Sequence, residues 1–526
     1  MKHLLLLLLA LRPLPAPMKH LLFFLLLTLA ITPCAHTQSA IPNPKSEIPN
    51  ILWFVVDDMS PHFSCYGETT IATPNIDRLA AEGTRFTRAY VTAPVCSTCR
   101  SALITGLYQT TIGAHHHRSG RGDLKIHLPE GVTPVPALFQ KAGYFTCIGS
   151  GLPGKDHAGH DLASRKNKKG KSTQAPLGKT DYNFEWDPAI YNSPDWADHG
   201  DKPFFMQVQL HGGKLREGPM AKRAAYRQRV IATFGNATDP EKVTLPPYYP
   251  RDPVLLQDWA DYLDAVRLTD HHVGQVIARL EKENLLENTL IIFMTDHGIS
   301  HARGKQFLYN EGTHVPFIVR GPGIAKGTVR DDLIEQIDLA PTSLAAAHLP
   351  IPPAIQGRNL FAKDYTPRTE VFAARDRCDE TTENLRSIRT DRFLYIRNGH
   401  PQRPHLQPNA YKDAKPILIA LRAAHTAGTL PSVSEDLLFS PTRAPEELYD
   451  TLQDPHQVTN LATNPTFKDT LEKHRQLLDA KLTATRDPAP ETPAQYDSDM
   501  AEYLKKKDPI VEANIALMKK WAAEGK

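Results

Sequence analysis

Two continuous apolar runs along the chain each lead into acidic residues. Residues 50–56 read NILWFVV and are followed by Asp57 and Asp58, and residues 288–294 read NTLIIFM and lead to Asp296 and His297. Runs without alternating polar positions are typical of strands that are buried on both faces, as in parallel sheets. Because ligands of such sheets bind beyond the carboxyl ends of the strands, both acidic clusters are predicted to lie at a binding edge.

Helical and strand-like segments alternate around these two runs. Helical periodicity covers 76–82, 135–142 and 256–282, and further strands are predicted at 144–149, 204–210 and 315–319. This alternation predicts an α/β fold with a mostly parallel central sheet flanked by helices. The pattern changes near residue 365, so we expect a catalytic domain over 45–364, a smaller C-terminal α+β domain over 365–485 and a charged helical tail over 486–526.

The N-terminus carries a duplicated targeting pattern. Lys2 and His3 precede a leucine run, and Met18 begins the same pattern again before an apolar stretch that ends at Ile31. A short basic region followed by about ten apolar residues is typical of a secretory signal. We therefore predict a signal peptide over residues 1–37, with Met18 as the true start. The protein is then exported, periplasmic or secreted, with no membrane span in the mature chain.

Net charge and cysteine content limit the possible binding partners and the possible cysteine chemistry. The formal net charge of +3 over 526 residues gives no support for nucleic acid or an anionic membrane as a partner. After Cys34 there are five cysteines, so at least one is free or modified. Cys96 and Cys99 form a CxxC pair, but the chain has no second CxxC of the kind that such a zinc site needs.

The acidic clusters have a structural and a functional interpretation. Asp57 and Asp58 taken alone are as typical of a helix cap or a solvated turn as of a ligand set. A lone pair such as Asp296 with His297 is more often a hydrogen-bonded structural pair than a ligand set. Together, at the ends of two buried strands, they predict a site for one divalent cation. Three carboxylates favour Ca²⁺, and the imidazole also admits Mn²⁺ or zinc.

Residues 96–106, CSTCRSALITG, resemble the signature of the formylglycine-dependent sulfatases, which is Cys-x-Pro-Ser-Arg followed by x-x-Leu-x-Thr-Gly. Further motifs match in the family's order from residue 50 to about residue 462: ATPNID at 72–77, GKDH at 154–157, GK at 304–305, DLAPT at 338–342 and ELYD at 447–450. The resemblance implies the alkaline-phosphatase-like sulfatase fold, and it is greatest to the sulfamidase-like branch.

The resemblance also implies a metal site and a nucleophile. Its metal ligands would be Asp57, Asp58, Asp296, His297 and the modified Cys96. A formylglycine-generating enzyme would convert Cys96 to formylglycine during maturation. One hydroxyl of the hydrated aldehyde would attack sulfur, and the other would later expel sulfate by reforming the aldehyde.

Further residues receive roles from the same resemblance. Arg100 would hold the hydrated formylglycine, Lys155 and Lys305 would bind sulfate oxygens, and His157 would assist proton transfer. Lys214 stands by count where the family has a histidine, with His211 three residues earlier, so both are candidate substrate-binding residues.

A histidine run at 115–117 and Arg118 follow the nucleophile segment. Three consecutive side chains do not all face one point, so we expect a substrate-facing loop rather than a metal site. His115 and Arg118 are the candidates that contact a sugar or a sulfate.

The leading hypothesis is a sulfatase that acts on a sulfated carbohydrate. His297 replaces the family's commoner asparagine, which keeps open a phosphonate monoester or phosphodiester hydrolase of the same superfamily. Thr98 replaces the usual proline and Cys99 the usual serine. These two replacements, with the disulfide that Cys99 could form with Cys96, motivate a third alternative, an inactive sulfatase-like binding protein.

Overall fold

The apolar run at residues 50–56 forms an interior strand of a large sheet. The computed structural model describes residues 48–161, 179–218 and 220–526, so the predicted signal peptide lies outside the described residues. Seven strands follow the order β3-β4-β1-β5-β6-β2-β7. Their bounds are β1 (Asn50–Val56), β2 (Thr84–Tyr90), β3 (Phe145–Gly149), β4 (Phe204–Leu210), β5 (Thr289–Thr295), β6 (His314–Arg320) and β7 (Thr328–Glu335).

Within this sheet β6 runs antiparallel to its neighbours β5 and β2, and the other described pairs are parallel. The predicted α/β fold with a mostly parallel sheet is therefore confirmed. The residues that follow β1, β4 and β5 lie at one edge, because these three strands are adjacent and parallel.

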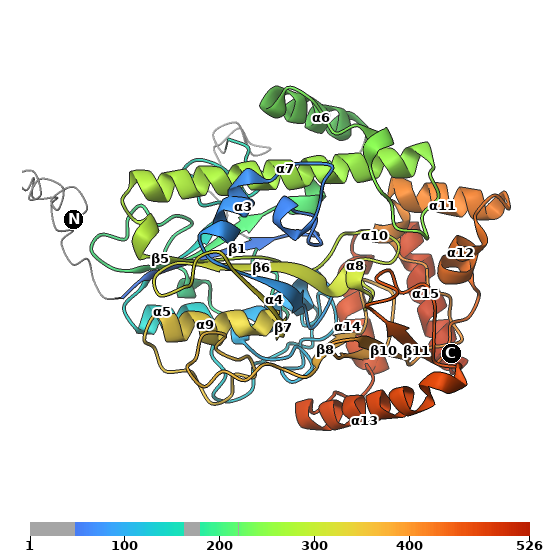
Figure 1. The fold of residues 1–526 in the computed structure, drawn as a ribbon. Coiled ribbons are helices and arrows are strands. Elements are labelled where there is room, and N and C mark those ends of the chain that lie inside the picture. The colour runs from blue at the N-terminus through green and yellow to red at the C-terminus, as the bar shows by residue number, and fades with distance from the viewer. Residues whose placement is uncertain (1–47, 162–178, 219) are drawn as a thin grey trace, which may run out of the picture. The chain divides into compact units, whose positions relative to one another are not determined.

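Helices cover both faces of the sheet (Figure 1). On one face lie α3 (Pro74–Ala81) and α7 (Pro253–Lys282), and on the other lie α4 (Cys96–Thr105), α5 (Val135–Lys141) and α9 (Leu339–Ala346). Alternate residues of β1 enter the two cores, with Phe54 in the first and Trp53 in the second. Burial on both faces explains why this strand has no polar alternation in the sequence.

A second sheet of four antiparallel strands follows, in the order β11-β10-β9-β8. Its strands are β8 (Val371–Arg375), β9 (Leu385–Arg389), β10 (Phe393–Asn398) and β11 (Glu446–Asp450). Leu471 and Leu478 of α13 (Lys468–Thr485) join its hydrophobic core with Ile388 and Tyr395. The remaining helices are α6 (Met220–Phe234), α8 (Asn310–Thr313), α10 (Ala410–Asp413), α11 (Pro416–Thr426), α12 (Ser432–Ser434), α14 (Pro493–Leu504) and α15 (Pro509–Ala523).

The predicted boundary near residue 365 falls in the connection between α9 and β8. The division of the chain into a catalytic domain, a C-terminal domain and a tail stays a prediction. Among the described residues, no helix is long and apolar enough to cross a membrane.

Candidate active site

The ends of β1 and β5 bring three carboxylates together. Asp57 and Asp58 follow β1, and Asp296 follows β5. Asp58 has a left-handed backbone with φ of 55°, a conformation that aspartate tolerates better than most residues. Its backbone N–H donates to Asp296 Oδ1 at 3.1 Å, which fixes the two acids against each other. All three carboxylates are buried.

Cys96 is the first residue of α4, and its side chain points at these acids. Its Sγ lies 3.1 Å from Lys305 Nζ, 3.2 Å from His297 Nε2 and 3.9 Å from Asp58 Oδ1. Its neighbour Cys99, three residues further along the helix, is buried among apolar residues, and both cysteines are free. The structure therefore places the predicted nucleophile position beside the predicted metal ligands.

Four of these side chains could hold one metal ion. Ligand atoms of Asp58, Cys96, Asp296 and His297 lie within 4.8 Å of one another, and all four residues are buried. His297 Nδ1 lies 2.9 Å from the carbonyl oxygen of Gly298, so that Nδ1–H donates there and the lone pair of Nε2 faces the cluster. This donor set of carboxylates and one imidazole fits a divalent cation.

Cationic side chains surround the carboxylates. Asp57 accepts hydrogen bonds from Lys214 at 2.7 Å, from Lys179 at 2.9 Å and from Arg100. Arg100 also donates to Asp296 Oδ2 at 3.1 Å. Lys179 was not found from the sequence, because it follows a polar segment without a motif around it.

The same charges shift the pKa values of Asp58, Cys96 and Lys214. Burial raises the pKa of Asp58, but Lys214 and Lys305 outweigh it and hold that pKa well below its ordinary value. Burial likewise raises the pKa of the Cys96 thiol, and the ammonium groups of Lys179, Lys214 and Lys305 bring it well below its ordinary value. For Lys214, burial lowers the pKa but Asp57 and Asp58 hold it well above normal, so Lys214 provides charge rather than a transferable proton.

The segment 211–214 passes directly over the backbone of the acids. A Cβ atom on Gly212 would lie 2.1 Å from the carbonyl oxygen of Asp57, and one on Gly213 would lie 2.2 Å from that of Asp58. Only glycine permits this approach, which carries Lys214 to its position 3.5 Å from Cys96 Sγ.

Two predicted histidines meet beside this segment. The rings of His157 and His211 lie 4.2 Å apart, and burial, with the neighbouring His157, lowers the pKa of His211 to about 4. Lys155, in contrast, pairs with Asp161 at 2.8 Å and is partly exposed. It is not among the described residues that line the cavity at Cys96, so its role stays a prediction.

Cys96 opens onto a cavity of about 270 Å³. The base is formed by Cys96, Lys214 and Lys305, and the walls by His117, Arg118, Lys179, Asp181, Asp379, Glu380, Ala410, Tyr411, Tyr503, Lys506, Asp508 and Val511. Arg118 belongs to the described lining and His115 does not. Their contacts with a sugar or a sulfate stay predictions. Tyr411, which no sequence motif indicated, lies with its hydroxyl 3.4 Å from Asp58 Oδ2.

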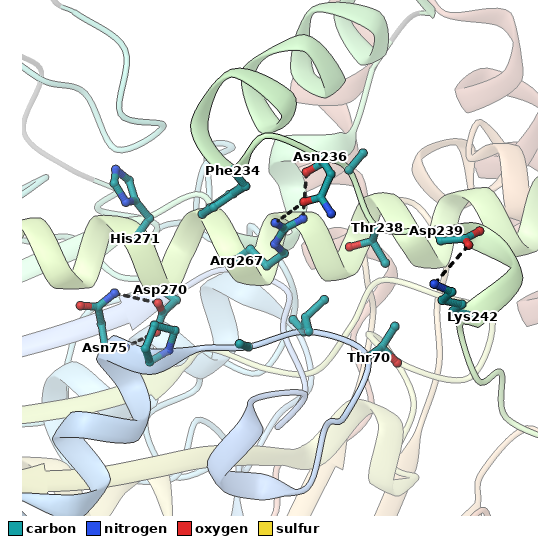
Figure 2. Close-up of a pocket in the computed structure, with 14 residues that line it drawn as sticks. Thr70, Asn75, Phe234, Asn236, Thr238, Asp239, Lys242, Arg267, Asp270 and His271 are labelled. Carbon is teal, nitrogen blue, oxygen red and sulfur yellow. Dashed lines mark hydrogen bonds and ion pairs between the residues drawn. The ribbon is translucent and has the colours of Figure 1, made fainter.

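A roomier cavity of about 510 Å³ lies elsewhere, along α7 (Figure 2). None of the predicted site residues lines it. Its central acid, Asp270, accepts hydrogen bonds from the backbone N–H groups of Asn75 and Ile76 at 3.0 and 2.8 Å. Asp270 therefore holds the start of α3, and the polar groups in Figure 2 mainly serve the fold.

Comparison with known proteins places these features in a family. The family model described as Sulfatase matches residues 49–349. An "Ulvan-active sulfatase" of Formosa agariphila is 30% identical over 84% of this chain and 76% of its own length. Human "N-sulphoglucosamine sulphohydrolase" is 28% identical over 84% of this chain and 91% of its own length.

Solved structures share the fold. One, a complex with "D-Glucosamine-2-N, 6-O-disulfate", has a TM-score of 0.55 and 19% identity, covering 84% of this chain and 99% of its own. A phosphonate monoester hydrolase from Silicibacter pomeroyi has a TM-score of 0.54 and 18% identity, covering 84% of this chain and 96% of its own. At these identities the likeness concerns the fold alone.

If the carboxylate cluster binds a metal ion, the loss of one carboxylate should weaken metal binding measurably. We expect Asp296→Asn to weaken metal affinity by more than the ~10–100-fold that loss of an outer-shell partner costs, because it removes a ligand charge. Metal content after desalting, measured by elemental analysis, checks this. Asp364→Asn is the matched control, since Asp364 is exposed and distant from the motif segments; equal metal content in the two variants would contradict the assignment.

Proposed function

The chain belongs to the sulfatase family and is a sulfuric ester hydrolase, and we propose that its nucleophile is a formylglycine made from Cys96. The observation that carries this proposal is the position of Cys96 Sγ, within hydrogen-bonding distance of both Lys305 and His297 at the floor of a cavity. In the mature enzyme, the oxygens of the hydrated aldehyde would take the place of this sulfur. A free thiol, with no disulfide to Cys99, is the form that the conversion needs.

We propose that Asp57, Asp58, Asp296 and His297 hold one divalent cation, with Ca²⁺ favoured by the carboxylates. When bound, the cation supplies Lewis-acid stabilisation of the sulfate oxygens and lowers the pKa of a coordinated hydroxyl.

The chain's own cations neutralise the sulfate group. Lys305, Lys214 and Lys179 line the cavity, and their ammonium groups can donate to sulfate oxygens as charge develops there. Arg100 is fixed by Asp57 and Asp296 one helical turn after Cys96, so it is placed to orient the nucleophile. His157 is the candidate for proton transfer to the leaving oxygen. Burial lowers the pKa of His211 to about 4, so His211 is neutral at pH 7 and is placed to bind substrate by hydrogen bonds rather than to donate a proton.

The substrate class we propose is a sulfated carbohydrate, with a sulfate ester or a sulfamate as the group cleaved. The human relative is named for a sulphoglucosamine, and one structural neighbour was solved with a disulfated glucosamine. Polar and aromatic groups of the cavity wall, such as Arg118 and Tyr503, are of the kind that bind sugar hydroxyls and acidic substituents.

We further propose export to the periplasm or outside the cell, on the basis of the N-terminal pattern, and maturation by a formylglycine-generating enzyme. The three-part domain division remains part of this proposal.

The modification of Cys96 can be read from a single tryptic peptide. Cleavage after Arg88 and Arg100 releases residues 89–100, which contain both Cys96 and Cys99. After reduction and alkylation of protein from its native host, we expect one alkylated cysteine, Cys99, and a carbonyl in place of the thiol at Cys96. Mass spectrometry distinguishes this from two alkylated cysteines. Two intact thiols in active enzyme would refute the mechanism, and a disulfide before reduction would support the inactive alternative.

The choice between sulfate and phosphonate esters needs paired assays. With aryl esters that share one leaving group, we expect kcat/KM for the sulfate to exceed that for the phosphonate by about tenfold or more, that is by ~1.4 kcal/mol of transition-state stabilisation. Cys96→Ser, measured with both esters, shows whether the two reactions share the site. Faster phosphonate turnover would instead favour the alternative that His297 motivates.

If the substrate is a sulfated carbohydrate, Arg118 should matter more for a sulfated sugar than for a simple aryl sulfate. We expect Arg118→Gln to lower kcat/KM for a sulfated glucosamine by ~10–100-fold, as for loss of one charged hydrogen bond worth ~1.5–3 kcal/mol. The same change is expected to leave para-nitrophenyl sulfate within a few-fold of wild type, because this ester has no sugar to contact. Arg251→Gln, at an exposed position, is the control; equal losses with both substrates would count against a sugar contact.

A further inference from the structure

A second buried group of potential metal ligands lies beside the candidate active site. It consists of His117, from the segment after α4, and of Cys378 and Asp379, which follow β8. Their exposed fractions are 5%, 0% and 6%. None of these residues has a role in the proposed reaction.

The spacing of the three side chains matches that of a tetrahedral zinc site. His117 Nδ1 lies 3.1 Å from Asp379 Oδ1 and 3.6 Å from Cys378 Sγ, and Cys378 Sγ lies 3.7 Å from Asp379 Oδ2. Bonds of ~2.0–2.3 Å at tetrahedral angles place neighbouring zinc ligands about 3.4–3.6 Å apart. One ion therefore fits among these atoms with only small side-chain rotations.

We propose that His117, Cys378 and Asp379 bind one Zn²⁺ ion, separate from the cation at Asp58 and Asp296. Three protein ligands leave a fourth position for water or for an oxygen of a bound ligand. His117 and Asp379 both line the cavity that contains Cys96, so this position faces the space that we assign to the saccharide.

The donor atoms of His117, Cys378 and Asp379 favour Zn²⁺ over the Ca²⁺ that we favour at Asp58 and Asp296. A thiolate and an imidazole are softer donors than carboxylates, and they favour Zn²⁺ over Ca²⁺ or Mg²⁺. Thiolate and carboxylate together also neutralise the dication. Of the neighbouring arginines, Arg377 is already balanced by Glu491 at 2.9 Å and by Asp499.

Contacts around the three residues hold them in place. The hydroxyl of Tyr503 donates to Asp379 Oδ1 at 2.9 Å, and the backbone N–H of His117 donates to the carbonyl of Arg377 at 2.9 Å. Outer contacts of this kind orient the ligands of known metal sites.

The test uses cobalt absorption in the full-length chain carrying Cys96→Ser, which removes the thiol and the formylglycine of the first site. Metal-free protein is titrated with Co²⁺ and then with Zn²⁺. We expect a thiolate-to-cobalt charge-transfer band that saturates at one equivalent and is lost on addition of zinc, which binds the same ligands more tightly.

Added cysteine variants identify the thiolate. Cys378→Ser should abolish the band, while Cys147→Ser should retain it. Cys147 is also buried, and its Sγ lies 3.2 Å from the carbonyl of Asp195, a contact that serine keeps. In case Cys378→Ser does not fold, His117→Gln retains the thiol and should weaken cobalt binding at least tenfold.

No charge-transfer band in the Cys96→Ser protein, or a band that survives Cys378→Ser in folded protein, would overturn the proposal. Because these variants have no nucleophile, the result is independent of the proposed sulfatase mechanism. The peptide of residues 89–100 tests that mechanism separately.

Discussion

Three carboxylates are buried at the carboxyl ends of β1 and β5, and the structure around them depends on the compensation of their negative charge. Asp57, Asp58 and Asp296 are at most 2% exposed, and isolated buried charges of this kind cost several kcal/mol each. Cations from distant parts of the chain compensate them. Lys305 follows β5, Lys214 follows β4, and Arg100 lies on α4. A divalent ion at the proposed metal site would neutralise the same carboxylates.

This compensation constrains the backbone around the acids. Lys214 reaches Asp57 only because Gly212 and Gly213 let its segment lie against the carbonyl groups of Asp57 and Asp58. Arg216, two residues further on, donates to the carbonyl of Gly213 and pairs with Asp258 of α7 at 3.3 Å. The loop that carries the charge is therefore attached to the longest helix of the described chain. These contacts connect Lys214, which lines the cavity at Cys96, to a helix of the hydrophobic core.

The sequence predicted those parts that are encoded locally. The buried strand at 50–56 has no polar alternation, and the motif at 96–106 carries the nucleophile position, so the sheet and Cys96 could be inferred. The strands at 84–90 and 328–335 were missed because charged residues interrupt both. Lys179 and Tyr411 were missed for another reason. Each reaches the site only through tertiary packing, and neither has a neighbouring pattern that indicates it.

The C-terminal part contributes residues to the cavity at Cys96 as well as to the fold. Tyr503, Lys506, Asp508 and Val511 come from α14, α15 and the turn between them, yet they line the cavity with Cys96. Tyr503 also holds Asp379, which in turn contacts His117 from the segment after the nucleophile helix. The groups proposed to bind sulfate come from the strand ends and from α4, whereas Asp379 and Tyr503 line other parts of the same cavity. Under the proposed function, changes in the C-terminal helices would therefore alter which sulfated molecule is accepted without changing Cys96.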